Sequence, residues 1–491
     1  MSGISFDVEY DLAVIGGGAA GKSAALTAAK GGLNVVILEK MPEAMGSAQH
    51  AEGACAFESS EQKAWEGGDV HMPTKEEGFR EYMRYSHYRA NAPIVSMFVK
   101  NSAEAIEMLR EVGVEFEKVI SYLPDMPEEL ASMHIPKGMG MRCQELLQKA
   151  VRDAGVDIFV NTPVEHLILD NGAVVGVIAK DSDGNEIQIG AKAVIIATGG
   201  YGCNKELMKK YNYIGGDSSV WATIPPEMGV KNTGDGFALA EEAGGVINGG
   251  GVVQLFAGGI GKLPGSESGA AGTQPCLWVN QGGERFINED IATKGTFAGT
   301  ALAGQKDSIA YGILDQDMIE YLQNVGSDTS FGAFLQMHKP MTHLLDELEQ
   351  DMAAGQAWKA DSMEALVDQI GLPKEAFLKT VENYNHACDK GIDEEFYKEP
   401  CFMKAIRRAP FYAVRIAPDY PTTCGGIMVN ENLQVLNREH QPIAGLFATG
   451  NDASGLYGDT YTMTVPGSTN GFAHTSGMVA AKYILSALKT E

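Results

Sequence analysis

Residues 10–40 form a glycine-rich segment that constrains the fold more than any other part of the chain. They read YDLAVIGGGAAGKSAALTAAKGGLNVVILEK. A short apolar run at 12–15 leads into a glycine turn at 16–21, and small residues suited to a helix follow. A second apolar run at 35–38 then ends at Glu39. Strand, glycine turn, helix, strand and terminal acid within about thirty residues predict a dinucleotide-binding unit.

Each glycine of this turn has a distinct expected role. Gly16 permits the tight turn, Gly18 lets the backbone approach a pyrophosphate, and Gly21 lets the helix pack closely on the strand. The start of the helix offers unpaired N–H groups to the phosphates. Glu39 is placed to accept hydrogen bonds from both ribose hydroxyls, which disfavours a 2′-phosphate. A glycine-rich turn in another kind of α/β protein is the alternative, and the complete context disfavours it.

Length and charge limit the class of protein. A chain of 491 residues is too long for one compact core, so we expect two or three domains. The net charge of −26 disfavours nucleic acid and anionic membranes as partners, because both would repel it. The N-terminal residues do not resemble a signal peptide, and no apolar window is long enough to span a membrane. We therefore expect a cytoplasmic protein.

Cysteine and histidine patterns give no indication of a metal. The seven cysteines are scattered and form no CxxC pair, which disfavours iron–sulfur, structural zinc and thioredoxin-like chemistry. The ten histidines include no HExxH motif. We predict no catalytic metal.

The order of apolar runs predicts an α/β fold in which one domain interrupts another. Residues 164–189 alternate as antiparallel strands and lead into a fully apolar strand at 193–198, typical of a buried parallel sheet. The composition then changes, with helical stretches and no long buried strand. We expect residues 1–255 and 410–491 to form the nucleotide domain and residues 256–409 to be inserted in it.

Four further motifs follow the glycine turn in a fixed order. They are ATGG at 197–200, TGDG at 233–236, RFINE at 285–289 and GLFATG at 445–450. This ordered set resembles the flavoprotein subunits of fumarate reductase and succinate dehydrogenase and their soluble relatives, including urocanate reductases and 3-ketosteroid dehydrogenases. The resemblance covers nearly the whole chain.

The resemblance implies a Rossmann-like FAD-binding domain with an inserted capping domain that closes over the isoalloxazine ring. The glycine turn would bind the pyrophosphate, Glu39 the adenosine ribose, and the last helix the N1/O2 edge of the flavin, whose negative charge a helix N-terminus stabilises. The cofactor-binding residues implied in this way are Gly16, Gly18, Ala19, Ala20, Gly21, Glu39, Lys40, Ser47, Ala48, Gly53, Ala54, Val164, Thr198, Gly199, Asp235, Asn451, Asp452, Gly467, Ser468 and Thr469.

The sequence departs from this family at the position of covalent attachment. The membrane complexes hold FAD through a histidine, and Ser47 stands at that position here. His50 is nearby but out of register. We therefore expect non-covalent FAD.

The charged groups that bind a dicarboxylate in fumarate reductases are also missing. Thr422, Thr464 and Thr293 stand where those enzymes have a histidine, a carboxylate-binding arginine and a proton-donating arginine. Without these groups a dicarboxylate loses its charge-assisted hydrogen bonds, so fumarate and succinate are disfavoured as substrates.

The remaining pattern is more similar to the ketosteroid branch, where a tyrosine carries the proton. Tyr457 and Tyr461 precede the last glycine turn, and Lys294 follows RFINE, so these three are the candidate catalytic residues. The family's own tyrosine position is occupied by Met463. Packing in a loop for both tyrosines, and a solvated surface position for Lys294, are the alternatives.

These features predict hydride transfer between flavin N5 and the β-carbon of a neutral enone, such as a 3-ketosteroid, a bile-acid-like compound or a phenolic enone. Backbone N–H groups near Gly467 would stabilise the developing enolate. One alternative is an enzyme of small unsaturated acids that uses Lys294 or Arg415, and another is an electron-transfer flavoprotein without an organic substrate. No second dinucleotide site is apparent, so we expect electrons from free reduced flavin or a redox protein.

Overall fold

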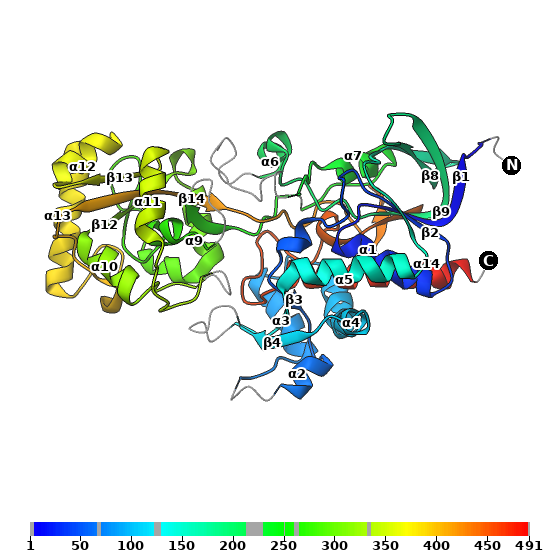
Figure 1. Ribbon diagram of the computed structural model, residues 1–491, viewed down its shortest axis with the longest axis horizontal. Helices are drawn as coiled ribbons and strands as arrows, with labels where there is room; N and C mark the ends of the chain where they lie inside the picture. The colour runs from blue at the N-terminus through cyan, green and yellow to red at the C-terminus, as the bar shows by residue number, and fades with distance from the viewer. Residues whose placement is uncertain are drawn as a thin grey trace. The chain divides into compact units, whose positions relative to one another are not determined.

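The computed structural model describes residues 4–65, 70–121, 129–212, 229–249, 251–259, 265–330 and 335–489 (Figure 1). These residues divide into two compact units. The first comprises the described parts of Met1–Asn212, Ile224–Val253 and Thr422–Glu491, and the second consists mainly of Gln254–Pro421. Each unit has its own sheet and its own apolar core, so each is described separately.

The first unit contains the predicted dinucleotide-binding sheet. Strand β1 (Val8–Ile15) pairs in parallel with β2 (Val35–Leu38) on one side and with β9 (Glu186–Ile196) on the other. The sheet continues to β6 (Asp157–Phe159) beyond β2, and to β16 (Pro442–Ala448) and β15 (Gln434–Leu436) beyond β9. The central strands are buried on both faces, as their continuous apolar runs predict.

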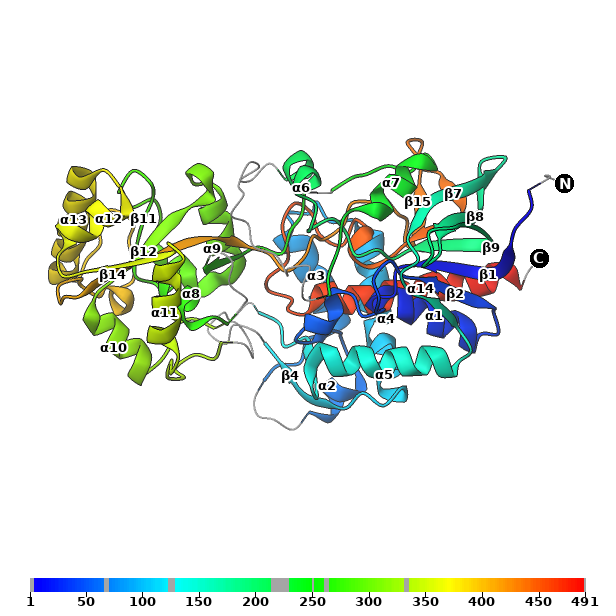
Figure 2. The same cartoon turned by 45° about the horizontal axis from the view of Figure 1, so that its top comes forward.

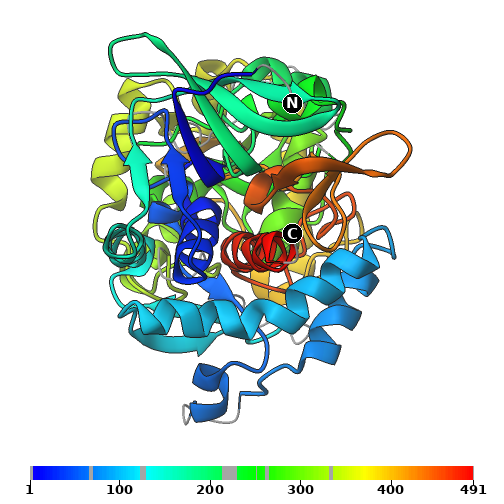
Figure 3. The same cartoon turned by 90° about the vertical axis from the view of Figure 1, so that its right-hand side faces the viewer.

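Helices cover one face of this sheet, as Figure 3 shows. They are α1 (Ala19–Lys30), α4 (Ala92–Glu111), α5 (Met139–Asp153) and the last helix α14 (Ser468–Leu488). Small residues let α1 and α14 pack closely: a Cβ at Gly477 would lie 2.1 Å from the carbonyl oxygen of Ala20. This contact brings the middle of the last helix beside the start of α1.

Antiparallel strands extend the sheet where the sequence predicts them. Strand β7 (Val164–Asp170) pairs with β8 (Ala173–Lys180), which pairs with the first part of β9. A smaller sheet in the same unit has the order β3 (Ala54–Cys55), β5 (Met133–Pro136), β4 (Phe116–Ile120). Helices α2 (Ser60–Ala64), α3 (Lys75–Tyr85), α6 (Lys205–Tyr211) and α7 (Asp235–Glu242) complete the regular elements that bear on the site.

The second unit contains a five-stranded sheet. Its order is β10 (Phe256–Gly259), β14 (Phe411–Asp419), β12 (Ala310–Leu314) and β11 (Leu277–Val279), and β13 (Ala357–Ala360) also pairs with β14. In Figure 2 its helices lie around these strands: α8 (Glu267–Gly272), α9 (Gly295–Ala303), α10 (Gln316–Asn324), α11 (Leu344–Ala353), α12 (Met363–Ile370) and α13 (Lys374–Lys390). Neighbouring residues along β12 and β14 enter two different apolar clusters, so the sheet is covered on both faces.

This sheet differs from the sequence expectation in one respect. Residues 410–491 are expected to return to the nucleotide domain, and the insertion is expected to lack a long buried strand. Strand β14 nevertheless pairs with β10, β12 and β13, so residues 411–419 lie in the second unit. Eight of the nine residues of β14 are buried, as suits a strand inside a sheet that is covered on both faces.

Three observations concern the cysteines, possible metal sites and possible membrane-spanning helices. All seven cysteines are free thiols. Among the described residues, no three His, Cys, Asp or Glu side chains come together as a metal site would require. In the same part of the chain, no helix combines the length and apolar character needed to cross a bilayer.

Candidate active site

The glycine turn, residues 16–21, lines a space that is open beside Gly18, and we call this space the cradle. Gly16 follows β1 with φ +104°, and a Cβ there would lie 2.3 Å from the carbonyl oxygen of Ala197. A Cβ at Gly21 would lie 2.0 Å from the oxygen of Gly16, which explains why the helix needs glycine there. A Cβ at Gly18 would meet only the Cα of Gly46, at 3.9 Å, among the described residues. The space in front of Gly18 is therefore open to a ligand.

The first turn of α1 faces this cradle and contains no acidic residue. Gly18 is the N-cap, no side chain among the described residues caps the helix, and Ala19 and Ala20 occupy its first turn. Unpaired backbone N–H groups at a helix N-terminus bind phosphate. The donors and the open space therefore fit the pyrophosphate of a dinucleotide.

Glu39 lies buried at the end of β2, beside the turn. Its Oε2 accepts a hydrogen bond from Gly17 N and its Oε1 accepts one from Met41 N, each at 2.8 Å. A carboxylate has about four acceptor sites, so both oxygens can still accept from ribose hydroxyls. Thr162 N donates to the Glu39 carbonyl oxygen at 2.8 Å, which brings Val164, at the start of β7, next to Glu39.

Lys40 and Asp235 lie together, although the two are far apart in sequence. Lys40 Nζ lies 2.6 Å from Asp235 Oδ2 and donates to Thr233 Oγ1 at the same distance. Asp235 is the first residue of α7, and its negative charge is favourable at that helix N-terminus. The predicted cofactor contacts of both residues stay predictions.

Asp452 follows β16 and forms hydrogen bonds with the residues that follow the neighbouring strand β9. Its buried carboxylate accepts hydrogen bonds from Gly199 N at 3.0 Å, Gly200 N at 3.1 Å and Thr198 Oγ1 at 3.0 Å. Burial raises the pKa of Asp452 to about 6, although these donors oppose the rise. The adjacent Asn451 donates from Nδ2 to Thr422 Oγ1 at 2.6 Å. Asp452 therefore holds the ATGG segment in place, whatever else it contacts.

The predicted flavin-lining residues gather at the start of α14. Cys55 N donates to the Gly467 carbonyl oxygen at 2.9 Å, and Asn470 Nδ2 donates to the Gly53 carbonyl oxygen at 3.1 Å. These bonds place Gly53 and Ala54 next to the first turn of α14, which contains Ser468 and Thr469. The N-cap is Gly467, with φ +74° and no side-chain cap in the described structure. This turn fits the electron-rich edge of a flavin.

Ser47 and Ala48 lie in a short helix, Ser47–His50, which packs on the start of α5. A Cβ at Gly140 would lie 2.1 Å from the Ala48 carbonyl oxygen, and Gly140 N donates to the Ala51 carbonyl oxygen at 2.8 Å. The close approach fixes the backbone of this segment through α5.

Three buried tyrosines surround the hydroxyl of Ser468. We call Tyr82, Tyr457 and Tyr461 the tyrosine cluster. The Tyr457 hydroxyl lies 2.8 Å from Ser468 Oγ, and the Tyr457 ring centroid lies 5.3 Å from that of Tyr461 and 6.3 Å from that of Tyr82. Burial raises the pKa of all three phenols above the usual value, so they are neutral hydrogen-bond donors at physiological pH.

The cluster includes a residue that sequence reasoning missed. Tyr82 comes from α3, as does Glu81, which accepts a hydrogen bond from Thr464 Oγ1. Glu81 also accepts two hydrogen bonds from Arg84, Nε to Oε2 at 2.8 Å and Nη2 to Oε1 at 2.7 Å. The amphipathic pattern of α3 could have indicated that Tyr82 is buried, but no local pattern connects α3 with residues 457–468.

The third catalytic candidate lies in the second unit. Lys294 ends a short helix, Glu289–Lys294, and its side chain is exposed. Arg415, the alternative cation, lies on β14 with its guanidinium 5.2 Å from the ring of Trp358. The tyrosines belong to the first unit, so the structure brings Tyr457 and Tyr461 together but groups Lys294 with neither.

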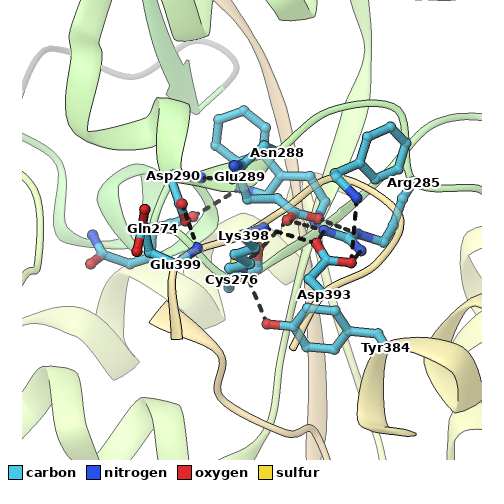
Figure 4. A network of polar contacts seen from close by, with 12 residues as sticks. Gln274, Cys276, Arg285, Asn288, Glu289, Asp290, Tyr384, Asp393, Lys398 and Glu399 are labelled. Atoms are coloured by element: carbon cyan, nitrogen blue, oxygen red, sulfur yellow. Dashed lines mark hydrogen bonds and ion pairs between the residues drawn. The ribbon is translucent and has the colours of Figure 1, made fainter. Parts of the chain in front are cut away.

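The RFINE motif forms a buried network of charges, shown in Figure 4. We call Arg285, Glu289, Asp393 and Lys398 the ion quartet. Arg285 Nη2 lies 2.7 Å from Glu289 Oε2 and 2.9 Å from Asp393 Oδ2, and Lys398 Nζ lies 3.4 Å from Glu289 Oε2. No side chain of the quartet is more than 3% exposed. Burial alone would raise the pKa of Asp393, but hydrogen bonds from Arg285 outweigh it and lower that pKa to about 2.

Comparison with known proteins extends this picture. Residues 11–464 match the family model described as an FAD binding domain. The chain is 36% identical to vinyl phenol reductase of Lactiplantibacillus plantarum, covering 96% of both chains, and 26% identical to 3-oxosteroid 1-dehydrogenase of Mycolicibacterium smegmatis, covering 96% of both. The open conformation of a flavocytochrome c3 fumarate reductase superimposes with a TM-score of 0.72 at 25% identity, covering 98% of this chain and 79% of that chain.

Proposed function

Since this chain belongs to the FAD binding domain family of fumarate reductase and succinate dehydrogenase flavoproteins, we propose that it reduces a C=C bond conjugated to a neutral phenol or ketone. It is an FAD-dependent oxidoreductase that acts on CH–CH groups. The substrate class and the direction are the proposed part. They depend on the polar groups that the first unit gathers at the start of α14.

One observation carries the proposal: the side chains that meet at this turn are neutral hydroxyls. Tyr457 and Tyr461 lie beside Ser468, and burial keeps both phenols protonated. Thr464, at the position of the family's carboxylate-binding arginine, donates to Glu81, so the group behind it is a carboxylate. A substrate carboxylate there would lose the charge-assisted bonds that an arginine at the position of Thr464 supplies. A neutral oxygen, in contrast, finds suitable donors.

A vinyl group conjugated to a phenol is the first candidate within this class. The similarity to a vinyl phenol reductase over nearly the whole of both chains supports it. A ketone such as a 3-ketosteroid is the second candidate, supported by the weaker similarity to a steroid dehydrogenase. Both carry a neutral oxygen at one end of a conjugated system, which hydroxyl and N–H donors can bind without a counter-charge.

Several residues of the chain would each have a separate role in the reaction. Bound FAD, once reduced by an electron donor, would supply the hydride for one carbon of the double bond. Tyr461 would donate the proton that adds to the other carbon, because its buried phenol stays protonated at neutral pH. Backbone N–H groups at Gly467 and Ser468 would hydrogen-bond the substrate oxygen, and for a ketone they would stabilise the negative charge that hydride addition places on it. Tyr457, hydrogen-bonded to Ser468, would support that turn.

Two other functions make different predictions. A reductase of small unsaturated acids would need a cation such as Arg415, but the guanidinium of Arg415 lies against Trp358. Lys294 is exposed and remains a candidate cation for an acid reductase, so the test below includes unsaturated acids. An electron-transfer flavoprotein would reduce no alkene at all.

Anaerobic reoxidation tests these alternatives. The protein is reduced with dithionite, and flavin absorbance is followed after adding 4-vinylphenol, a 3-ketosteroid enone, urocanate or acrylate. We expect 4-vinylphenol to reoxidise the flavin fastest and the acids to have little effect. Reoxidation by the acids alone would replace the proposal with the acid reductase, and no reoxidation by any alkene would favour electron transfer.

Replacing Tyr461 by phenylalanine tests the proton donor. Tyr461→Phe should keep FAD bound and reducible, yet slow alkene reduction by roughly a hundredfold or more, as loss of a general acid does. Stopped-flow reoxidation at neutral pH measures this step. Tyr82→Phe is the matched control, because it removes a phenol from the same cluster. Near-normal turnover in Tyr461→Phe, or an equal loss in both variants, would contradict the assignment.

We also expect the flavin to be non-covalently bound. Ser47 occupies the position at which the membrane complexes attach FAD, and a serine hydroxyl does not supply the nucleophile found there. Precipitation with acid should leave a colourless pellet and all the FAD in the supernatant. Yellow colour that stays with the denatured polypeptide would show covalent attachment.

A further inference from the structure

Lys22 is a completely buried lysine near the start of α1. Its Nζ donates to the carbonyl oxygen of Ala44 at 2.8 Å and to that of Gln144 at 3.3 Å. Lysine is almost never fully buried unless it is paired, yet no carboxylate of the described residues lies within ion-pair distance of this ammonium. Neutral carbonyls satisfy its hydrogen bonds but do not neutralise its charge, so an anion is the missing partner.

The carbonyl that Lys22 holds belongs to the wall of the cradle. A Cβ at Gly17 would lie 2.5 Å from the Cβ of Ala44, so this segment presses on the glycine turn. Two residues later, Gly46 approaches the open space in front of Gly18. Lys22 therefore fastens residues 44–46 to the helix whose N-terminus faces the same space.

When the cradle holds no anion, Lys22 is only partly protonated at neutral pH, because of the groups around it. Burial lowers the pKa of Lys22 to about 7, whereas Glu39 opposes this and Arg152 adds to it. On the α14 side, burial lowers the pKa of His474 to about 3, so that ring is neutral at physiological pH and adds no charge. Burial also raises the pKa of the Cys143 thiol to about 11, so it is uncharged as well.

We propose that Lys22 is a cofactor-positioning residue, which holds residues 44–46 against the glycine turn and takes up a proton when the FAD pyrophosphate binds. The proposal concerns cofactor binding and does not depend on the substrate. The lysine can donate to both carbonyls in either protonation state. Proton uptake therefore adds charge to the cradle without breaking its hydrogen bonds.

The direction of the pH dependence follows from linkage. Negative charge in the cradle raises the pKa of Lys22 above its value of about 7 in the empty cradle. Binding is then strongest where Lys22 is protonated in both states, below about pH 7, and weakens as the pH rises through the pKa of the complex. Affinity falls by about tenfold for each unit by which FAD raises that pKa.

The test uses the holoenzyme and the fluorescence of released FAD. Samples are diluted at pH 6 to 9, and the dissociation constant is determined at each pH. In the wild type it should rise about tenfold or more over this range. Lys22→Met should bind FAD more weakly at pH 6 and lose the rise. Lys30→Met is the matched control, since it removes an exposed lysine from the last turn of the same helix.

Three results would overturn the proposal. One is a flat profile in the wild type, and another is a wild-type rise that persists in Lys22→Met. The third is a flat profile in Lys30→Met, which would show that any charge on α1 suffices. If Lys22→Met does not fold, Lys22→Gln replaces it, because glutamine can still donate to the Ala44 carbonyl but carries no charge.

Discussion

The Gly18→Val variant is expected to fold and to contain no FAD. The backbone at Gly18 has φ −76° and ψ −167°, which valine adopts without strain, and a Cβ meets only Gly46 Cα at 3.9 Å among the described atoms. The new side chain therefore fills the space of the ligand and not that of the protein. Losing two charge-assisted bonds to the phosphates costs about 3–6 kcal/mol, which weakens FAD binding by roughly a hundredfold or more.

Circular dichroism and the flavin absorbance of the purified protein check this result together. Gly32→Ala is the control: it adds a side chain to open space at the other end of α1, with φ +95°, and should keep FAD at a small cost in stability. If the purified Gly18→Val protein were yellow and fully loaded with FAD, the cofactor would not pass this position. An unfolded variant would mean that Gly18 serves the fold, contrary to its geometry.

Replacing Glu289 by glutamine is expected to destabilise the second unit severely. Glu289 accepts hydrogen bonds from Arg285 and lies 3.4 Å from the ammonium of Lys398, and all three side chains are almost completely buried. Removing its charge leaves the quartet with an uncompensated buried cation. Breaking a buried ion pair in this way costs about 3–5 kcal/mol. Urea unfolding followed by tryptophan fluorescence, which reports on the buried Trp278 of this unit, measures the loss.

An exposed ion pair of the same unit provides the comparison. Glu320 pairs with Arg408, and both side chains are about half exposed. Glu320→Gln should therefore leave the stability nearly unchanged. Equal losses in the two variants would show that burial does not decide the contribution of Glu289. A stable Glu289→Gln protein would show that the quartet is dispensable for the fold.

The dinucleotide unit could be predicted from sequence because its information is local. Strand β1, the glycine turn, α1 and β2 follow one another within residues 8–38, and each is specified by its own apolar period or by its glycines. The close contacts at Gly16 and Gly21 explain why side chains are excluded there. The family and the cofactor follow from the order of the motifs, which also needs no tertiary information.

The contacts at the start of α14 and within the ion quartet could not be predicted in the same way. Thr464 and Glu81 are 383 residues apart in sequence, and Arg285 and Asp393 are 108 apart. No periodicity relates such positions, because they meet only after separate helices and strands have packed. The assignment of residues 411–419 to the nucleotide domain differs from the structure for the same reason: an apolar strand does not specify which sheet it joins.

The sequence by itself determined the local unit that holds a dinucleotide, the family and the absence of the cations that bind a dicarboxylate. Those features depend on residue type and on spacing over a few turns of chain. Only the tertiary structure decided which side chains are buried together, and burial sets their protonation. It keeps the phenols of Tyr457 and Tyr461 neutral, and it turns Lys22, an ordinary helix lysine in the sequence, into a charge that responds to its surroundings.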